Sequence, residues 1–281
     1  MQNADVTNEN IVETVKERYA RAATEGASCC GPGACGSSAG EKMTLGIGYS
    51  KDQLTAIPEG ADLGLGCGAP LNHLALRPGE TVLDLGSGAG IDVFLAANAV
   101  GPTGRAIGVD MTPEMLARAR RNAERRGLSN TEFREGRLEA LPVDSGTIDA
   151  VTSNCVINLV PDKAKVFAEV ARVLKPGGRL VISDMVLERR LPERVEKDVY
   201  AYVGCISGAA MKDQYFAQLR ATGLTEIEIL KEIDYVAVLA EQGPEEAQSL
   251  LDRNGVTLDE LRGCVKSVTF RATKPVNSTL V

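Results

Sequence analysis

VLDLGSGAG (residues 82–90) is the stretch of this sequence that decides the fold. Its apolar start predicts a buried strand, its three glycines predict a tight turn that a ligand can approach closely, and the apolar run after it predicts a helix. The spacing is G-x-G-x-G, whereas dinucleotide sites carry G-x-G-x-x-G. Asp84 would repel a pyrophosphate but suits a cationic ligand that carries an amino acid. Asp110 ends the next predicted strand, where an acid can accept hydrogen bonds from both hydroxyls of a ribose.

Strand and helix patterns alternate on both sides of this stretch. Repeating strand–helix units predict an α/β fold with a doubly wound, Rossmann-like parallel sheet and helices on both faces. The predicted strands are 81–85, 105–110, 131–134, 148–153, 179–185, 226–230 and 265–272. The predicted helices are 8–23, 92–99, 113–126, 162–174, 192–202, 212–222 and 244–253, with a short one after Ser50.

The chain divides into three parts by pattern. Residues 1–63 form an N-terminal arm, whose helix is followed by a loop over residues 26–40 that is rich in glycine and small residues. Residues 64–240 form the main domain, and residues 241–281 form a C-terminal extension that ends in a strand of the sheet.

Composition excludes several classes of function. The net charge of −7 argues against nucleic acid as a partner, because phosphate binding needs concentrated Lys and Arg. No apolar run is long enough to span a membrane, and the polar N-terminus carries no secretory signal, so we expect a cytoplasmic protein that acts as a monomer. A single histidine, His73, leaves little room for histidine-based zinc or triad chemistry, whereas seven cysteines suggest functional thiols.

The region around the glycine motif resembles the class I S-adenosylmethionine (SAM) methyltransferases. DLGSGAG (84–90), GVD (108–110), EGRLEALP (135–142) and RVLKPGGRL (172–180) carry the resemblance. It implies that Asp84, Gly86 and Gly88 hold the methionine end of SAM and that Asp110 binds the ribose. It also implies that Met111, Leu138 and Glu139 lie around the adenine. The residues expected to bind the cofactor are Asp84, Gly86, Ser87, Gly88, Asp110, Met111, Leu138, Glu139 and Asn154.

The methyl acceptor is indicated by the cysteines. Cys155 follows the strand that delivers it to the cofactor crevice, Cys67 lies in a glycine loop just before the cofactor strand, and Cys205 follows the fifth strand. The Pro-Pro-aromatic motif of amino-group methyltransferases is missing at 154–158, and no metal set of the catechol type can be assembled. Thiolates select soft ions, and three of them suit pyramidal As(III), whose lone pair can attack a methyl group without a general base.

Four further segments make the resemblance closer. GASCCG (26–31), LGCG (65–68), SNCVINLVPDK (153–163) and YVGCISGA (202–209) look like segments of the arsenite methyltransferases. This resemblance implies that Cys67, Cys155 and Cys205 are As(III) ligands and that Cys29 or Cys30 pairs with Cys67 during turnover. Cys35 has no assigned role. The resemblance also implies arsenite as substrate and glutathione or thioredoxin as reductant.

Two other interpretations stay open at this point. One is a SAM methyltransferase of a small organic acceptor of the quinone type, in which the cysteines are incidental. The other is a non-catalytic, thiol-based arsenic-binding protein.

Overall fold

The fold is described here from a computed structural model, which describes residues 8–25, 37–196, 198, 206 and 208–276. The expectations for Cys29, Cys30, Cys35 and Cys205 lie outside the described residues, and so do residues 197 and 199–202 of the helix predicted at 192–202. The described part of the chain is built around one eight-stranded sheet. Its order is β3-β2-β1-β4-β5-β8-β7, and the short strand β6 (Ala210–Met211) pairs with β5.

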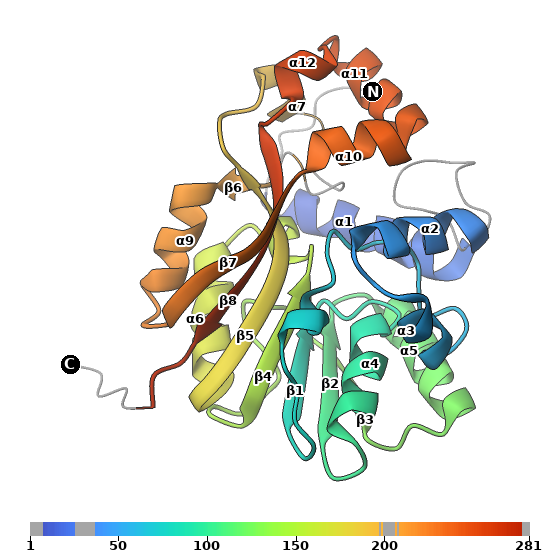
Figure 1. Cartoon of the computed structure of the whole chain (residues 1–281), viewed down its shortest axis with the longest axis vertical. Coiled ribbons are helices and arrows are strands. Elements are labelled where there is room, and N and C mark those ends of the chain that lie inside the picture. The colour runs from blue at the N-terminus through green and yellow to red at the C-terminus, as the bar shows by residue number, and fades with distance from the viewer. Residues whose placement is uncertain (1–7, 26–36, 197, 199–205, 207, 277–281) are drawn as a thin grey trace.

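Five parallel strands form the half of the sheet that carries the glycine motif (Figure 1). Four of them have apolar cores of Val, Ile, Leu and Ala that are buried on both faces, as parallel sheets require, whereas the edge strand β3 buries only Phe133. The strands are β1 (Thr81–Leu85), β2 (Arg105–Asp110), β3 (Thr131–Glu135), β4 (Ile148–Asn154) and β5 (Leu174–Leu187).

Helices cover both faces of this sheet. One face packs against α4 (Ile91–Val100) and α5 (Pro113–Arg126), which bury side chains such as Phe94 and Leu116. The opposite face packs against α6 (Lys163–Val173) and α9 (Lys212–Arg220). The doubly wound α/β fold is therefore confirmed.

The C-terminal half of the sheet departs from the prediction of an all-parallel sheet. β8 (Val265–Thr273) lies between β5 and β7 (Thr225–Asp234) and runs antiparallel to both. Between β7 and β8 the chain forms three helices and returns to the end of the sheet that it had left, which makes β8 antiparallel. These helices are α10 (Tyr235–Gln242), α11 (Pro244–Asn254) and α12 (Leu258–Leu261).

Two N-terminal helices, α1 (Asn8–Glu25) and α2 (Ser37–Ile47), lie across the end of the sheet where β1, β2 and β4 finish (Figure 1). The third, α3 (Lys51–Ala56), lies beside α4 and α5, which hydrogen-bond to its carbonyls through Asn98 and Arg126. The prediction of a loop through residue 40 is wrong from Ser37 onward. Helix α2 forms there because tertiary contacts hold its second half: Ile47 is buried, and the Thr44 hydroxyl donates a hydrogen bond of 2.7 Å to Asp62.

The remaining described elements are short. They are two 3-10 turns (Pro70–His73 and Ile157–Leu159) and α7 (Glu193–Glu196). No helix within the described ranges is long and apolar enough to cross a membrane.

Candidate active site

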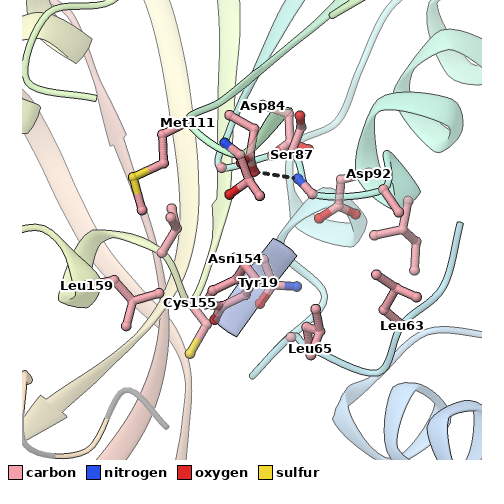
Figure 2. A pocket seen from close by; sticks show the side chains of 18 of the residues that line it. Tyr19, Leu63, Leu65, Asp84, Ser87, Asp92, Met111, Asn154, Cys155 and Leu159 are labelled. Carbon is pink, nitrogen blue, oxygen red and sulfur yellow. Dashed lines mark hydrogen bonds between the residues drawn. The ribbon is translucent and has the colours of Figure 1, made fainter. Parts of the chain in front are cut away.

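One pocket lies where the loops after β1, β2 and β4 meet the N-terminal helices (Figure 2). Ligands of open α/β sheets bind at these carboxyl ends. All nine residues expected from the sequence to bind the cofactor line this pocket: Asp84, Gly86, Ser87, Gly88, Asp110, Met111, Leu138, Glu139 and Asn154. Cys155 lines it as well.

The glycine loop after β1 forms one wall of the pocket. Gly86 and Gly88 adopt left-handed backbone angles, with φ of 67° and 51°, which favour glycine over residues that carry a Cβ. A Cβ on Gly86 would lie 2.4 Å from Cγ2 of Val156, so the loop is in direct contact with the segment that follows β4. The tight turn predicted from the glycine spacing is confirmed.

Carboxylates concentrate in this part of the pocket. Asp84 is buried, and no described residue forms a hydrogen bond or an ion pair with its carboxylate. Burial raises the pKa of Asp84 well above its ordinary value, and the nearby charges of Asp92 and Asp110 raise it further. An unpaired buried carboxylate is costly unless a counter-charge arrives, so this end of the pocket suits a cationic group.

Asp110 is held in place by the backbone around it. Its carboxylate accepts hydrogen bonds from the N–H of Gly88 (2.9 Å) and the N–H of Thr112 (2.8 Å). Burial raises the pKa of Asp110, and these two donors oppose that rise. Each oxygen keeps a second lone pair, which can accept a hydroxyl donor such as a ribose diol.

The rest of the pocket is largely apolar. In Figure 2, Met111 and Leu159 lie on one side of the pocket, and Leu63 and Leu65 lie on the other. Leu138 is buried beside Glu139, whose carboxylate pairs with Arg137 at 2.7 Å. Such walls suit a flat, weakly polar group.

Cys155 lies at the same end of the sheet, directly after β4. It has a left-handed backbone conformation (φ 61°), and its N–H donates to the carbonyl of Ser183 at 2.8 Å. A left-handed conformation is uncommon for a residue with a Cβ, and such strain concentrates at functional sites. The side chain is buried.

Cys67 lies in the loop before β1 and is not among the residues that line the pocket, but its N–H donates to Oδ1 of the pocket residue Asn154 at 2.9 Å. Cys67 and Cys155 belong to one cluster of buried side chains, against which Met111 packs. Burial raises the pKa of the Tyr215 hydroxyl well above its ordinary value, and the charges of Asp184 and of both cysteines raise it further. Cys205, the third expected ligand, lies outside the described residues.

Cys264 is the third cysteine in the described part of the chain. Cys264 is buried away from the pocket at the start of β8, where its Sγ donates to the carbonyl of Glu260. Within the described ranges, no three His, Cys, Asp or Glu side chains are grouped to hold a metal ion. Cys67 and Cys155 alone therefore supply only two of the three thiol ligands expected for As(III).

Sequence reasoning missed two polar residues of the site. Tyr49 and Asp92 both line the pocket, and both are buried. The Tyr49 hydroxyl donates to the Asp92 carboxylate and lies 2.9 Å from Oδ1 and 3.0 Å from Oδ2. Burial raises the pKa of Asp92 to about 6. Asp92 could have been found from the sequence, because it is an acid at the second position of the helix that follows the glycine loop. Tyr49 carried no comparable signal.

The chain is similar to known methyltransferases. A family model described as "Methyltransferase domain" matches residues 76–254. The chain is 46% identical over 235 residues to an arsenite methyltransferase of Halobacterium salinarum, which covers 80% of this chain and 60% of that protein. It is 42% identical over 174 residues to an arsenite methyltransferase of Aquipseudomonas alcaligenes, covering 59% of this chain and 50% of that protein.

A solved structure is similar as well. It is an arsenic (III) S-adenosylmethionine methyltransferase from Chlamydomonas reinhardtii, with 31% identity and a TM-score of 0.58, and the match covers 83% of this chain and 72% of that one. The resemblance expected from the sequence motifs is therefore confirmed. The matches span 60% and 50% of the length of the two curated relatives.

Proposed function

We propose that this chain, which belongs to the methyltransferase-domain family, transfers methyl groups from SAM to trivalent arsenic held by cysteine thiolates. The observation that carries the proposal is the hydrogen bond from the Cys67 N–H to Asn154, the residue directly before Cys155, at the edge of an acid-lined pocket. The same cysteines stand in the motifs that look like those of arsenite methyltransferases.

The pocket residues fit SAM by charge and by shape. When bound, SAM supplies an electrophilic methyl group on a sulfonium. Asp84 offers the unpaired carboxylate that its cationic methionine end needs, and Asp110 offers lone pairs for the ribose hydroxyls. Met111 and Leu138 offer apolar surface to the adenine.

The thiolates of Cys67, Cys155 and Cys205 hold As(III) in a pyramidal arrangement and leave its lone pair free. That lone pair forms the As–C bond as the bond between sulfur and the methyl carbon breaks, which releases S-adenosylhomocysteine. No proton leaves the nucleophile, so the step needs no general base. The only histidine of the chain, His73, is exposed and does not line the pocket.

The transfer formally oxidises arsenic to the pentavalent state, so two electrons must follow. We propose that a pair of thiols supplies them by forming a disulfide, with Cys67 and either Cys29 or Cys30 as the protein pair. Glutathione or thioredoxin then reduces that disulfide. A reducing compartment such as the cytoplasm would keep this cycle running.

Single cysteine variants test the proposal. We expect Cys155→Ser and Cys67→Ser each to lower arsenite methylation at least a hundredfold, measured by chromatography of the methylated arsenicals. SAM affinity, measured by calorimetry, should change less than threefold. Cys264→Ser is the matched control, because Cys264 is buried in the same cluster but donates its thiol to the carbonyl of Glu260.

Two outcomes would contradict the proposal in different ways. Full methyltransferase activity on a quinone-type acceptor in both variants would favour an organic substrate. Tight arsenite binding by the wild type without any SAM binding would favour an arsenic-binding protein.

A further inference from the structure

The backbone of Cys67 is held from two sides by side chains that are distant in the sequence. Its N–H donates to Oδ1 of Asn154 at 2.9 Å, and its carbonyl accepts a hydrogen bond from Oγ of Ser267 at 2.8 Å. Asn154 ends β4 and Ser267 lies on β8. The backbone N–H and carbonyl of Cys67 are therefore both bound to the sheet, although Cys67 itself lies in a loop.

The side-chain amide of Asn154 is fully used in this arrangement. Oδ1 also accepts from the N–H of Gly68 at 3.3 Å, while Nδ2 donates to the carbonyl of Gly68 at 2.7 Å and to the Tyr49 hydroxyl at 3.0 Å. Tyr49 in turn donates to the buried Asp92. An amide has two donor hydrogens and two acceptor lone pairs, so none is left for another ligand.

The glycines that flank Cys67 allow this close contact. A Cβ on Gly66 would lie 2.7 Å from Nδ2 of Asn154, and a Cβ on Gly68 would lie 2.5 Å from Oγ of Ser183. Contacts this short do not occur for real Cβ atoms, so only glycine lets the loop lie directly on the end of β4 and on β5 beside it.

We infer that Asn154 and Ser267 are positioning residues that hold Cys67 in register with Cys155, and that Tyr49 and Asp92 fix the orientation of Asn154. Asn154 directly precedes Cys155, whose N–H is itself bound to Ser183. Two of the three proposed arsenic ligands are thus attached to one hydrogen-bonded frame. A preorganised pair of thiols pays less ordering entropy when it binds As(III). This inference rests on the proposed function for its meaning, but its geometry can be tested without arsenic.

The first test measures hydrogen exchange of the loop in the protein without ligands. We expect Ser267→Ala and Asn154→Ala to speed amide exchange at least tenfold in peptides that cover residues 64–69, with little change in the strands. Thr269→Val is the matched control, since it removes another buried hydroxyl from the same strand that bonds to Ser183 and not to the Cys67 backbone. Unchanged exchange in both alanine variants would overturn the inference, whatever the substrate is.

The second test separates positioning from general destabilisation. In Ser267→Ala we expect the KM for arsenite to rise about tenfold, the loss expected for one or two hydrogen bonds. The KM for SAM should move less than twofold, and the absorbance of the arsenic–thiolate bonds at saturating arsenite should match that of wild type. An equal rise in both KM values, or none in either, would overturn the inference. If Cys67→Ser leaves arsenite binding intact, the proposed function fails, while the exchange result still stands or falls separately.

Discussion

The buried carboxylate of Asp84 is the clearest indication of a cationic ligand at the residue scale. It lies near two other carboxylates, and no described residue bonds with it. We expect Asp84→Asn to lower SAM affinity at least tenfold, because the cationic end of the ligand loses its counter-charge. We also expect the unliganded variant to unfold at a higher temperature, because an unpaired buried charge has been removed.

Asp149→Asn provides the control for Asp84. Asp149 accepts from Lys175 at 2.7 Å and from the N–H of Thr81 at 2.8 Å, at the opposite end of β1 from the pocket. Its variant should lose thermal stability and keep its SAM affinity by calorimetry. If Asp84→Asn behaved in the same way, Asp84 would be a structural residue and not part of the cofactor site.

The sequence predicted the pocket residues well because their chemistry and their position coincide. Asp84 and Asp110 stand in a glycine motif and at a strand end, so local spacing alone brings them to one place. Tyr49 and the role of Asn154 escaped prediction because they depend on contacts across 105 residues of chain. Ser267 was hidden for the same reason, since its contact with Cys67 spans 200 residues.

Helix α1 covers the pocket, and one arginine of α5 attaches it to the rest of the domain. The guanidinium of Arg118 donates to the carbonyl of Ala23 at 2.8 Å, near the end of α1, and to the carbonyl of Gly60 at 2.9 Å. Val15 and Tyr19 of α1 line the pocket beneath. We expect Arg118→Met to speed hydrogen exchange throughout α1 and to lower SAM affinity severalfold.

Arg121→Met is the matched control for that element. Arg121 lies on the same helix, but it is exposed and makes no hydrogen bond or ion pair with a described residue. Its exchange pattern and SAM affinity should match the wild type. Equal protection of α1 in the Arg118 and Arg121 variants would mean that apolar packing alone holds this cover.

At the scale of elements, the sequence predicted what local periodicity determines. The strands β1 to β4 and the helices α4 to α6 appear within a few residues of the expected bounds. Helix α2 was missed because its glycines read as a loop. Helix α10 was missed although Asp234 caps it and Val236 and Leu239 repeat at helical spacing. The antiparallel direction of β8 depends on where the chain re-enters the sheet, which no local pattern records.

For the whole molecule, the buried Asp184 makes stability depend on pH. It lies on β5 beneath an aromatic cluster, where it accepts hydrogen bonds from the Tyr215 hydroxyl and the N–H of Met185, both at 2.9 Å. Burial raises the pKa of Asp184 to about 7, although these bonds oppose the rise. Between about pH 4 and pH 7 the folded protein therefore holds a proton that the unfolded chain has released.

A raised carboxyl pKa gives stability that is complete at low pH and is lost as the pH rises through the folded value. We expect Asp184→Asn to remove this loss, because the amide is neutral at every pH and the Tyr215 hydroxyl can accept from it as well as donate. Urea unfolding measures the free energy of unfolding of both proteins from pH 5 to pH 8. Relative to the wild type, the free energy of unfolding of the variant should rise by a few kcal/mol over this range, on the order of 1.4 kcal/mol per unit of pKa. Asp92 titrates nearby in pH but is present in both proteins, so its contribution cancels in the difference. A constant difference across this range would mean that Asp184 stays ionised in the folded protein.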